Sequence, residues 1–363
     1  MLNKLTSSSR IDQYRLALLP AVQSAPPAAC CAALLAGGPA FLNLVLLNDL
    51  GPLWHHRLQS GGLLESLPRS SGDALRAARM AAAVGYLPQR AALAQLDQLF
   101  AAQGIPYLVM KGVFVRECVY PDPALRPACD VDILISPRHR LRAAKALLDN
   151  GYTVHVVPNN LSHEATFSSG LVDVDLHWHM QRPGHTRSDM TDGFIARRQQ
   201  VNGVWGLADN DALFMMLTHP AFNKYVCSPN MGLGRVADFL LWIQLKKVDW
   251  PAVVQLLDAE GVKTAAWIML TWLRMLAPPE AAKVLDEWLI ALRPGRLRAA
   301  YLRAWLTLDL PSRWLQRPLL VQAGFTLWMH DHLADAWRAL RERRLARQNR
   351  LRDARLLLGD DYQ

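Results

Sequence analysis

Short apolar segments alternate with amphipathic segments of helical length between residues 89 and 180. Residues 107–110 form a continuous apolar run, and residues 130–136 alternate polar with apolar positions, which are two patterns typical of strands. Such alternation predicts a small α/β unit with a mixed sheet of at least four strands. The expected helices are 89–103, 113–120 and 137–148, and the expected strands are 107–110, 130–136, 152–157 and 171–178, with 165–168 as an edge strand.

The segments on either side of this unit show helical patterns. Residues 10–88 predict short helices broken by proline and glycine, preceded by a loose polar arm. From about residue 209 the strand signals fade, and the expected helices are 212–217, 236–245, 250–260, 264–276 and 281–292. We therefore expect an α+β protein in three parts: an N-terminal helical segment (1–88), the α/β unit (89–200) and a C-terminal helical bundle with a basic tail (201–363).

Composition excludes a disordered chain and locates the positive charge. The 363 residues are 51% hydrophobic and 20% charged, which is enough to build two or three packed units. The formal net charge is +9, and residues 290–363 hold fourteen arginines against seven acidic residues. The basic character therefore belongs to the C-terminal quarter. This basic segment fits either a solvated helix face or a surface that binds an acidic partner. Because no aromatic residues are interleaved with its arginines, we do not expect it to bind nucleic acid.

Cysteine usage and hydropathy predict a cytoplasmic protein. The five cysteines are odd in number and form no CxxC pair, which favours free thiols in a reducing compartment. The longest uncharged run, residues 16–48, is cut by prolines into pieces shorter than the roughly 20 residues of a membrane span. The apolar part of any signal peptide is also very short. We expect no membrane association.

Two aspartates at 130 and 132 are the first candidate for chemistry. Alternate residues of a strand point to the same face, so Asp130 and Asp132 would lie about 6.6 Å apart on one side of the sheet. Their mutual repulsion requires solvent, a cation or a basic group nearby. Hard carboxylate oxygens suit Mg²⁺, although two solvated aspartates on an exposed edge would give the same pattern.

A second group of polar residues repeats this arrangement on a later strand. Asp173, Asp175 and His177 share one face of the segment 171–178. If the two strands pair, carboxylates from both converge, and such a cluster can hold two cations for phosphoryl or nucleotidyl transfer. Whether Asp173 joins the cluster stays open.

The dipeptide Lys111-Gly112 separates an expected strand from an expected helix. Glycine lets the backbone approach a phosphate, the helix N-terminus offers free N–H groups, and Lys111 adds a positive charge. Alone the dipeptide means little, but its place about 20 residues before Asp130 makes it informative.

Together these motifs resemble the bacterial family of uncharacterised nucleotidyltransferases, a distant branch of the polymerase-beta-type nucleotidyltransferase superfamily. The similar region spans roughly residues 89–180, with weaker likeness at His219, Arg235–Asp238 and Asp249-Trp250. The resemblance rests on Gly104-Ile105-Pro106, Val109–Gly112, Tyr120–Pro123, Arg126-Pro127, Asp130–Ile135 and Asp173–Trp178, in that order. It implies a nucleotidyltransferase-type catalytic unit.

The resemblance assigns roles residue by residue. Asp130 and Asp132 match the metal-binding Asp-x-Asp, and Asp175 matches a third carboxylate that bridges a metal and helps to deprotonate the attacking hydroxyl. Gly112 matches the phosphate-approach glycine. The superfamily usually has Gly-Ser or Gly-Gly there, whereas Val113 follows Gly112 and supplies no hydroxyl, a role that Lys111 can take over.

The implied reaction is an in-line displacement with a nucleoside triphosphate as substrate and two Mg²⁺ ions among Asp130, Asp132 and Asp175. An acceptor oxygen attacks the α-phosphorus and pyrophosphate leaves. The acceptor, a small molecule, peptide or protein, is not specified. A non-catalytic nucleotide-binding or regulatory protein on the same fold, or another phosphate or sugar-phosphate transferase, remains an alternative.

Four further polar features each have a functional and a structural interpretation. Arg126 is either a phosphate clamp or an ordinary loop arginine, and His177 either takes part in acid–base or phosphate chemistry or is structural. Arg235 either faces the cleft and binds nucleotide or pairs with Asp238 one helical turn away. We do not expect zinc at His177 and His179, which are only two ligands, or metal at His330-Asp331-His332, where alternate helical residues diverge.

Overall fold

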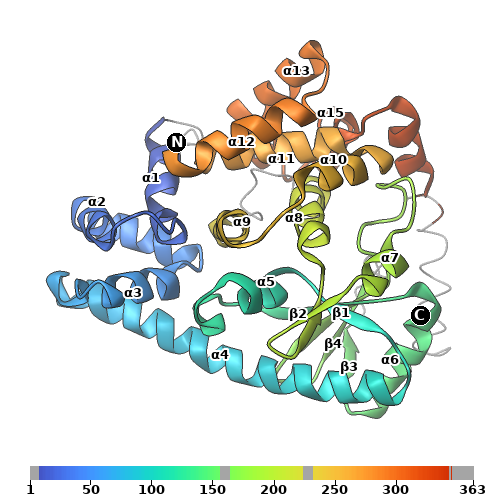
Figure 1. Cartoon of the computed structure of the whole chain (residues 1–363), viewed down its shortest axis with the longest axis horizontal. Coiled ribbons are helices and arrows are strands. Elements are labelled where there is room, and N and C mark those ends of the chain that lie inside the picture. The colour runs from blue at the N-terminus through green and yellow to red at the C-terminus, as the bar shows by residue number, and fades with distance from the viewer. Residues whose placement is uncertain (1–7, 156–163, 224–231, 343–344, 346–363) are drawn as a thin grey trace.

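The computed structural model describes residues 8–155, 164–223, 232–342 and 345. Its N-terminal part consists of helices that lead into the longest helix of the described chain (Figure 1). These elements are α1 (Ser8–Ala17), η1 (Leu19–Ala21), α2 (Pro27–Leu47), α3 (Gly51–Ser60), η2 (Leu64–Ser66) and α4 (Arg69–Ala102).

Helix α4 corrects the expectation of short helices up to residue 88. It runs through Pro88 and joins the segment we assigned to the N-terminal helices with the helix expected at 89–103. A proline inside a helix removes one backbone hydrogen bond. Buried apolar residues on both sides of Pro88, including Leu75 and Phe100, hold the two halves of α4 against the core. The boundary at 88/89 therefore falls inside a continuous helix.

Helix α2 is long and apolar enough to cross a membrane by length and composition alone. A buried core helix and a signal sequence near the N-terminus both pass the same test, so this is weak evidence. The helix is bent at Gly38, whose φ of 59° and ψ of −155° are not helical, directly before Pro39. The chain therefore breaks at Gly38-Pro39, where we expected a proline to interrupt this run, and α2 consists of two helical pieces joined across a kink.

The central part of the chain forms a mixed seven-stranded sheet in the order β3-β4-β5-β2-β1-β7-β6. Strand β2 runs parallel to β5 and antiparallel to β1. The strands are β1 (Tyr107–Val109), β2 (Asp130–Ile135), β3 (Thr153–His155), β4 (Glu164–Ser168), β5 (Asp173–His177), β6 (Gln199–Val201) and β7 (Val204–Gly206). The helices between them are α5 (Lys111–Val119), η3 (Pro123–Leu125), η4 (Pro137–His139), α6 (Arg140–Asp149) and α7 (Thr191–Ala196).

Two features of the sheet differ from the expectation. Strand β4 is not an edge strand, because it pairs with β3 on one side and with β5 on the other. The hairpin β6–β7 was not expected, and it extends the sheet past residue 200 by pairing β7 with β1. Its turn is Asn202-Gly203, both with positive φ, which is the strongest short hairpin signal in a sequence.

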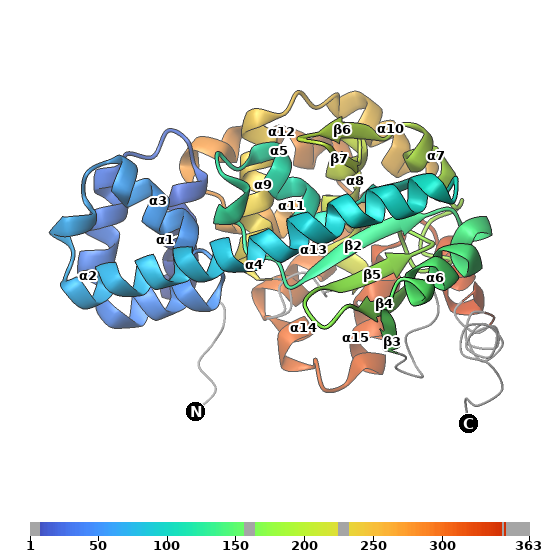
Figure 2. The same cartoon turned by 90° about the horizontal axis from the view of Figure 1, so that it is seen from below.

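The C-terminal part is helical, as expected, and covers one face of the sheet. Helices α4 and α6 lie on the opposite face, which both views show (Figures 1 and 2). The C-terminal elements are α8 (Asp209–Asn223), α9 (Leu233–Leu245), α10 (Trp250–Ala259), α11 (Lys263–Leu276), α12 (Pro279–Leu292), α13 (Arg296–Thr307), α14 (Leu310–Arg313), α15 (Pro318–Gly324) and η5 (Thr326–Met329). The α+β class is confirmed.

Alternation along β2 separates the core from the site. Val131, Ile133 and Ile135 are fully buried. Asp130 and Asp132 occupy the alternate positions and line a cavity together with residues of α8 and α9. The sheet therefore presents its acidic side chains toward the C-terminal helices.

Candidate active site

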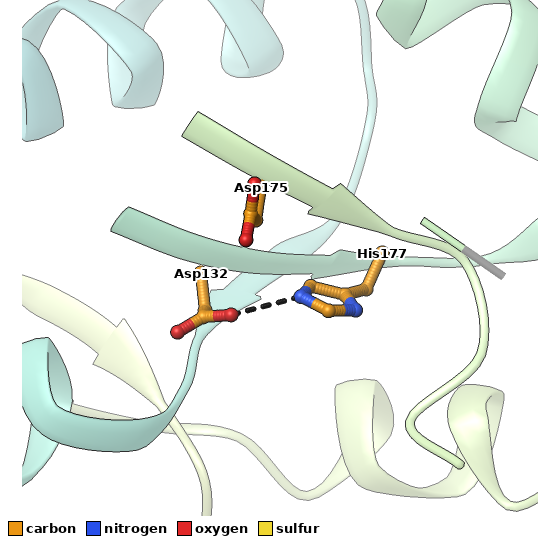
Figure 3. Close-up of side chains that lie close together, drawn as sticks. All are labelled: Asp132, Asp175 and His177. Atoms are coloured by element: carbon orange, nitrogen blue, oxygen red, sulfur yellow. Dashed lines mark hydrogen bonds and ion pairs between the residues drawn. The ribbon is translucent and has the colours of Figure 1, made fainter. Parts of the chain in front are cut away.

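The parallel pairing of β2 with β5 brings the two acidic motifs together. Asp130 is the register partner of Asp173, and Asp132 is the register partner of Asp175. Ligand atoms of Asp132, Asp175 and His177 all lie within 4.8 Å of one another (Figure 3). The sequence predicts that these carboxylates converge if the two strands pair, and the structure has both the pairing and the convergence.

Asp132 is the most enclosed carboxylate of the group, with 4% of its surface exposed. Its Oδ1 accepts hydrogen bonds from Lys111 Nζ and from His177 Nε2, the latter at 2.9 Å. Burial disfavours the charged form, but the Lys111 charge and the hydrogen bond from His177 outweigh it and hold the pKa of Asp132 well below its usual value. Asp132 is thus a fixed anion.

His177 links two carboxylates. Its Nε2 contacts Asp132 and its Nδ1 lies 3.1 Å from Glu164 Oε2 on β4. Burial and the charge of Lys111 oppose protonation, but the hydrogen bonds to Asp132 and Glu164 outweigh them and raise the pKa of His177. The two carboxylates fix the orientation of the His177 ring, and His177 in turn holds Asp132 in place.

The pKa values of the other two acids are shifted upward. Asp175 Oδ1 accepts a hydrogen bond of 2.6 Å from Thr166 Oγ1, and burial raises the pKa of Asp175. Burial, with the neighbouring charges of Asp132 and Asp175, raises the pKa of Asp130 to about 6. Close carboxylates that resist ionisation indicate a place where a cation stabilises the charged forms. Asp173 is exposed and is not part of the cavity wall.

The turn between β1 and α5 supplies the positive charge. Lys111 has a φ of 55°, an unusual conformation for a residue with a side chain, and its ammonium group reaches Asp132. The backbone N–H of Met110 donates to the Asp132 carbonyl at 2.9 Å, which fixes the start of the turn against β2. The strained backbone therefore serves to aim Lys111 into the site.

Gly112 makes room for Arg126. A Cβ atom at Gly112 would lie 3.1 Å from Nη2 and 3.3 Å from Cζ of the Arg126 guanidinium. Arg126 in turn donates from Nε and Nη2 to the two carboxylate oxygens of Asp238, each at 2.9 Å, and from Nη1 to the carbonyl of Pro127. One hydrogen on each Nη nitrogen remains, so the guanidinium is both anchored and able to donate further.

Asp238 is the anchor that joins α9 to this loop. It also accepts a hydrogen bond of 2.8 Å from the hydroxyl of Tyr120, and the pKa of Arg126 is raised because its pairing with Asp238 outweighs burial. Asp238 thus pairs with Arg126, from a distant part of the chain. Arg235 lines the same cavity as Arg126, which fits the cleft-facing interpretation.

These residues surround a cavity of about 500 Å³ between the sheet and the C-terminal helices. Its charged wall contains the acids of β2 and β5, and Met215, Phe239 and Met269 form an apolar part. The basic and acidic lining residues are Lys111, Arg126, Arg182, Arg235, Asp49, Asp130, Asp132, Glu164, Asp175 and Asp238. Such a mixture of charged and apolar walls suits a ligand with phosphates at one end and a ring at the other.

Glu164, Thr166 and Arg182 were missed by the sequence analysis. Glu164 and Thr166 alternate on β4, and their partners across the strand pair are His177 and Asp175. The alternation Glu-Ala-Thr-Phe-Ser is a half-buried strand pattern whose polar face could have been assigned to the site. No local signal distinguishes Arg182 from other loop arginines.

The remaining histidine motifs have structural surroundings. His179 Nδ1 lies 3.0 Å from Asp189. His330 is buried, and Asp331 accepts hydrogen bonds from the backbone N–H groups of Lys263 and Thr264 at the start of α11. In the described part of the chain, the one group of three such ligands is the cluster at Asp132. Of the arginine-rich tail, Arg343, Arg344, Arg347, Arg350, Arg352 and Arg355 lie outside the described residues.

Comparison with known proteins gives one family. A family model described as uncharacterised nucleotidyltransferase matches residues 38–278, which is more than half of the chain. The match includes the sheet, the acids of β2 and β5, and helices α8 to α11. No curated protein matches the chain.

Proposed function

Because this chain belongs to the family of uncharacterised nucleotidyltransferases, we propose that it moves a nucleoside monophosphate from a nucleoside triphosphate to a hydroxyl or phosphate acceptor. Pyrophosphate is the second product, and the reaction depends on Mg²⁺. The observation that carries this proposal is the register pairing of Asp132 with Asp175 beside the Lys111-Gly112 turn. Carboxylates and phosphate-binding groups share one cavity there.

The donor set fits magnesium. Both hydrogen bonds to the Asp132 side chain go to Oδ1, and Asp130 and Asp175 are carboxylates whose neighbours disfavour ionisation without a cation. We assign Asp130, Asp132 and Asp175 to hold Mg²⁺, which when bound neutralises charge on the triphosphate and acidifies the acceptor hydroxyl. His177 and Glu164 keep Asp132 in position.

The basic residues bind the triphosphate in this proposal. Lys111 and the next residues of α5 line one side of the cavity, and Arg126 and Arg235 line it from the loop and from α9. Held by Asp238 and Pro127, Arg126 loses little freedom when it binds a phosphate oxygen. This rigid cradle compensates for Val113, which supplies no hydroxyl after Gly112.

Asp175 is the base that we assign to the acceptor. Its carboxylate takes the acceptor proton while the acceptor oxygen bonds to the α-phosphorus. The bond from the α-phosphorus to the bridging oxygen breaks, and the electron pair leaves with pyrophosphate. The hydrogen bond from Thr166 fixes one oxygen of Asp175 and leaves the other for this role.

The test supplies α-³²P-labelled ATP, GTP, CTP and UTP in turn, with Mg²⁺, to purified protein in the presence of fractionated small-molecule and peptide pools. We expect pyrophosphate release and a labelled product that EDTA abolishes. An Asp132→Asn and Asp175→Asn double variant should release no pyrophosphate. Asp149→Asn, on the exposed end of α6, is the matched control and should behave as the parent.

Two results would contradict this function. If all four nucleotides bind but none is cleaved in the presence of any acceptor pool, the protein is a non-catalytic nucleotide-binding or regulatory protein on the same fold. If a parallel assay with γ-³²P-labelled nucleotides labels the product and the α-³²P-labelled nucleotides do not, the reaction is a different phosphate transfer.

A further inference from the structure

Helix α13 carries apolar side chains on the face that it turns to solvent. Leu297 and Tyr301 of α13 and Leu308, directly after its end, stand at positions i, i+4 and i+11, which fall on one side of a helix. Their exposed fractions are 90%, 37% and 51%. Leu302 and Trp305, by contrast, are buried in the core. A surface helix usually has a polar outer face, so α13 has an additional apolar face that is open to solvent.

Aromatic rings extend this face beyond α13. The ring centre of Tyr301 lies 5.3 Å from that of Trp328 in η5 and 6.2 Å from that of Trp305. The ring of Trp305 lies 5.3 Å from that of Trp314, at the end of α14. Trp314 and Trp328 are 36% and 44% exposed. One row of ring contacts therefore connects three exposed aromatic side chains.

Helix α15 adjoins the same row. The hydroxyl of Tyr301 donates to the carbonyl of Gly324 at the end of α15, and the ring of Trp305 packs directly against Gly324. At the other end of α15, Leu319 and Leu320 are 76% and 45% exposed. Single exposed leucines are ordinary, but so many large apolar side chains on adjoining elements indicate a binding surface. We call it the outer apolar surface; it consists of Leu297, Tyr301, Leu308, Trp314, Leu319, Leu320 and Trp328.

The charges around the outer apolar surface have one sign. Residues 293–330 contain six arginines and one acidic residue, Asp309, which is only 2% exposed. The next acid along the chain, Asp331, accepts hydrogen bonds from backbone N–H groups at the start of α11. The exposed arginines of this range are Arg293, Arg296, Arg303, Arg313 and Arg317. Such a surface complements a partner that is both anionic and apolar.

A lipid bilayer with anionic headgroups has this chemistry. Tryptophan and tyrosine favour the boundary between lipid and water, leucine side chains enter the acyl region, and guanidinium groups bind lipid phosphates. The leucines of the surface protrude, with Leu297 and Leu319 at least three quarters exposed. A protein partner must match such protruding side chains with hollows of its own, whereas a fluid bilayer adapts to them. These observations favour a membrane over a folded partner.

We propose that the outer apolar surface docks this protein peripherally on anionic lipid bilayers. Our expectation of no membrane association rested on the lack of an uninterrupted apolar span, and peripheral docking needs no such span. Helix α13 lies on the side of the C-terminal helices that is remote from the sheet (Figure 1). The residues of the outer apolar surface do not line the catalytic cavity, so docking is compatible with nucleotide binding and does not depend on the proposed function.

The experiment is co-sedimentation of the full chain with lipid vesicles, without nucleotide. Vesicles of phosphatidylcholine are compared with vesicles in which about one third of the lipid is phosphatidylglycerol. We expect the anionic vesicles to bind at least about tenfold more tightly, and added salt to weaken this binding because it screens the arginines. Poly-L-glutamate is added as a soluble anionic competitor without apolar groups.

A double variant tests the apolar contribution. Leu297→Gln with Leu319→Gln removes two protruding leucines, changes no charge and leaves the core intact. We expect its binding to anionic vesicles to fall about tenfold or more. Leu87→Gln with Leu171→Gln is the matched control, because these leucines are 66% and 84% exposed and lie outside the outer apolar surface. The control should bind as the parent does.

A second double variant tests the charge. Arg313→Gln with Arg317→Gln removes two exposed arginines beside the outer apolar surface. We expect binding to anionic vesicles to fall about tenfold, since each basic residue near an anionic surface contributes to it. Arg69→Gln with Arg138→Gln changes the net charge equally at exposed positions on α4 and η4. This control should leave vesicle binding unchanged.

The outcomes decide between partners. No binding to anionic vesicles, equal binding to both kinds of vesicle, or equal losses in variants and controls would overturn the proposal. If the leucine variant binds as the parent and poly-L-glutamate abolishes binding, the arginines serve a soluble acidic partner instead. If light scattering shows a dimer that the leucine variant lacks, without vesicle binding, the surface joins two copies of the chain. Loss of nucleotidyl transfer alone would contradict only the proposed function.

Discussion

Asp132 and Asp175 are direct register partners on neighbouring parallel strands, although they lie 43 positions apart in sequence. A shift of either strand by one residue would turn one of these side chains to the opposite face of the sheet, among the buried residues of the core. The register is fixed by buried alternate residues such as Val131 and Val174, which pair on the other face. Core packing thus places two carboxylates side by side.

Replacing either of these aspartates with asparagine should abolish most of the activity. Asp132→Asn and Asp175→Asn each remove a charged oxygen ligand at nearly constant shape, and we expect pyrophosphate release to fall at least about a hundredfold. The measurement is the rate with saturating Mg²⁺ and nucleotide, with circular dichroism to verify folding. Retention of more than half of the parent rate in either variant would remove these residues from the site.

Glu164 should act as a positioning residue through His177. In Glu164→Gln the hydrogen-bond acceptor for His177 Nδ1 remains while the charge is lost, so Asp132 is held less firmly. We expect Mg²⁺ affinity and kcat to fall about 10- to 100-fold, with little change in nucleotide KM. Ser168→Ala, on the same strand and away from the cavity, is the control. A loss confined to KM would mean that Glu164 contacts substrate.

The strand pattern predicted the acidic cluster because the period of two assigns a face to every residue. It could not predict that β4 lies between β3 and β5, since pairing depends on tertiary contacts that alternation does not encode. Glu164 was missed for this reason. Pro88 was expected to end a helix, and local propensity was overridden by apolar contacts along α4.

The partners of the arginines could not be predicted from the local sequence either. The spacing of Arg235 and Asp238 suggests an intrahelical pair, and spacing could not predict that Asp238 also binds Arg126, 112 positions away in sequence. Bidentate geometry and the hydrogen bond from Tyr120 make that contact better than any exposed pair on one helix. Sequence spacing alone does not contain this information.

Gly112→Ala tests whether Arg126 binds the nucleotide. The new Cβ would lie 3.1 Å from Arg126 Nη2, and the guanidinium must move by a few tenths of an ångström because the backbone turn is fixed. We expect nucleotide KM to rise about three- to tenfold with a smaller effect on kcat. Gly234→Ala is a matched control, since its Cβ would lie 3.6 Å from Arg126 Cζ in ordinary contact. An equal effect in both variants would argue against a role for Arg126.

His330 should make the fold sensitive to acid. Its ring packs against Phe222 and His185, with Asp331, Asp335 and Arg338 as charged neighbours, and burial lowers its pKa to about 4 from an ordinary value of 6.5. Because the folded pKa is the lower one, the unfolded chain binds more protons between pH 6.5 and 4. Stability is therefore complete above pH 6.5 and falls as the pH drops toward 4, by about 3 kcal/mol from this group.

The measurement is urea unfolding of the parent and of His330→Phe, which keeps an aromatic ring in the same cluster, between pH 7 and pH 4.5. The parent should lose more stability than the variant over this range, since phenylalanine takes up no proton. Other groups titrate in both proteins, so the difference between the two curves isolates the histidine. Parallel curves would show that His330 is protonated inside the fold at little cost, with Asp335 as the neighbour able to compensate its charge.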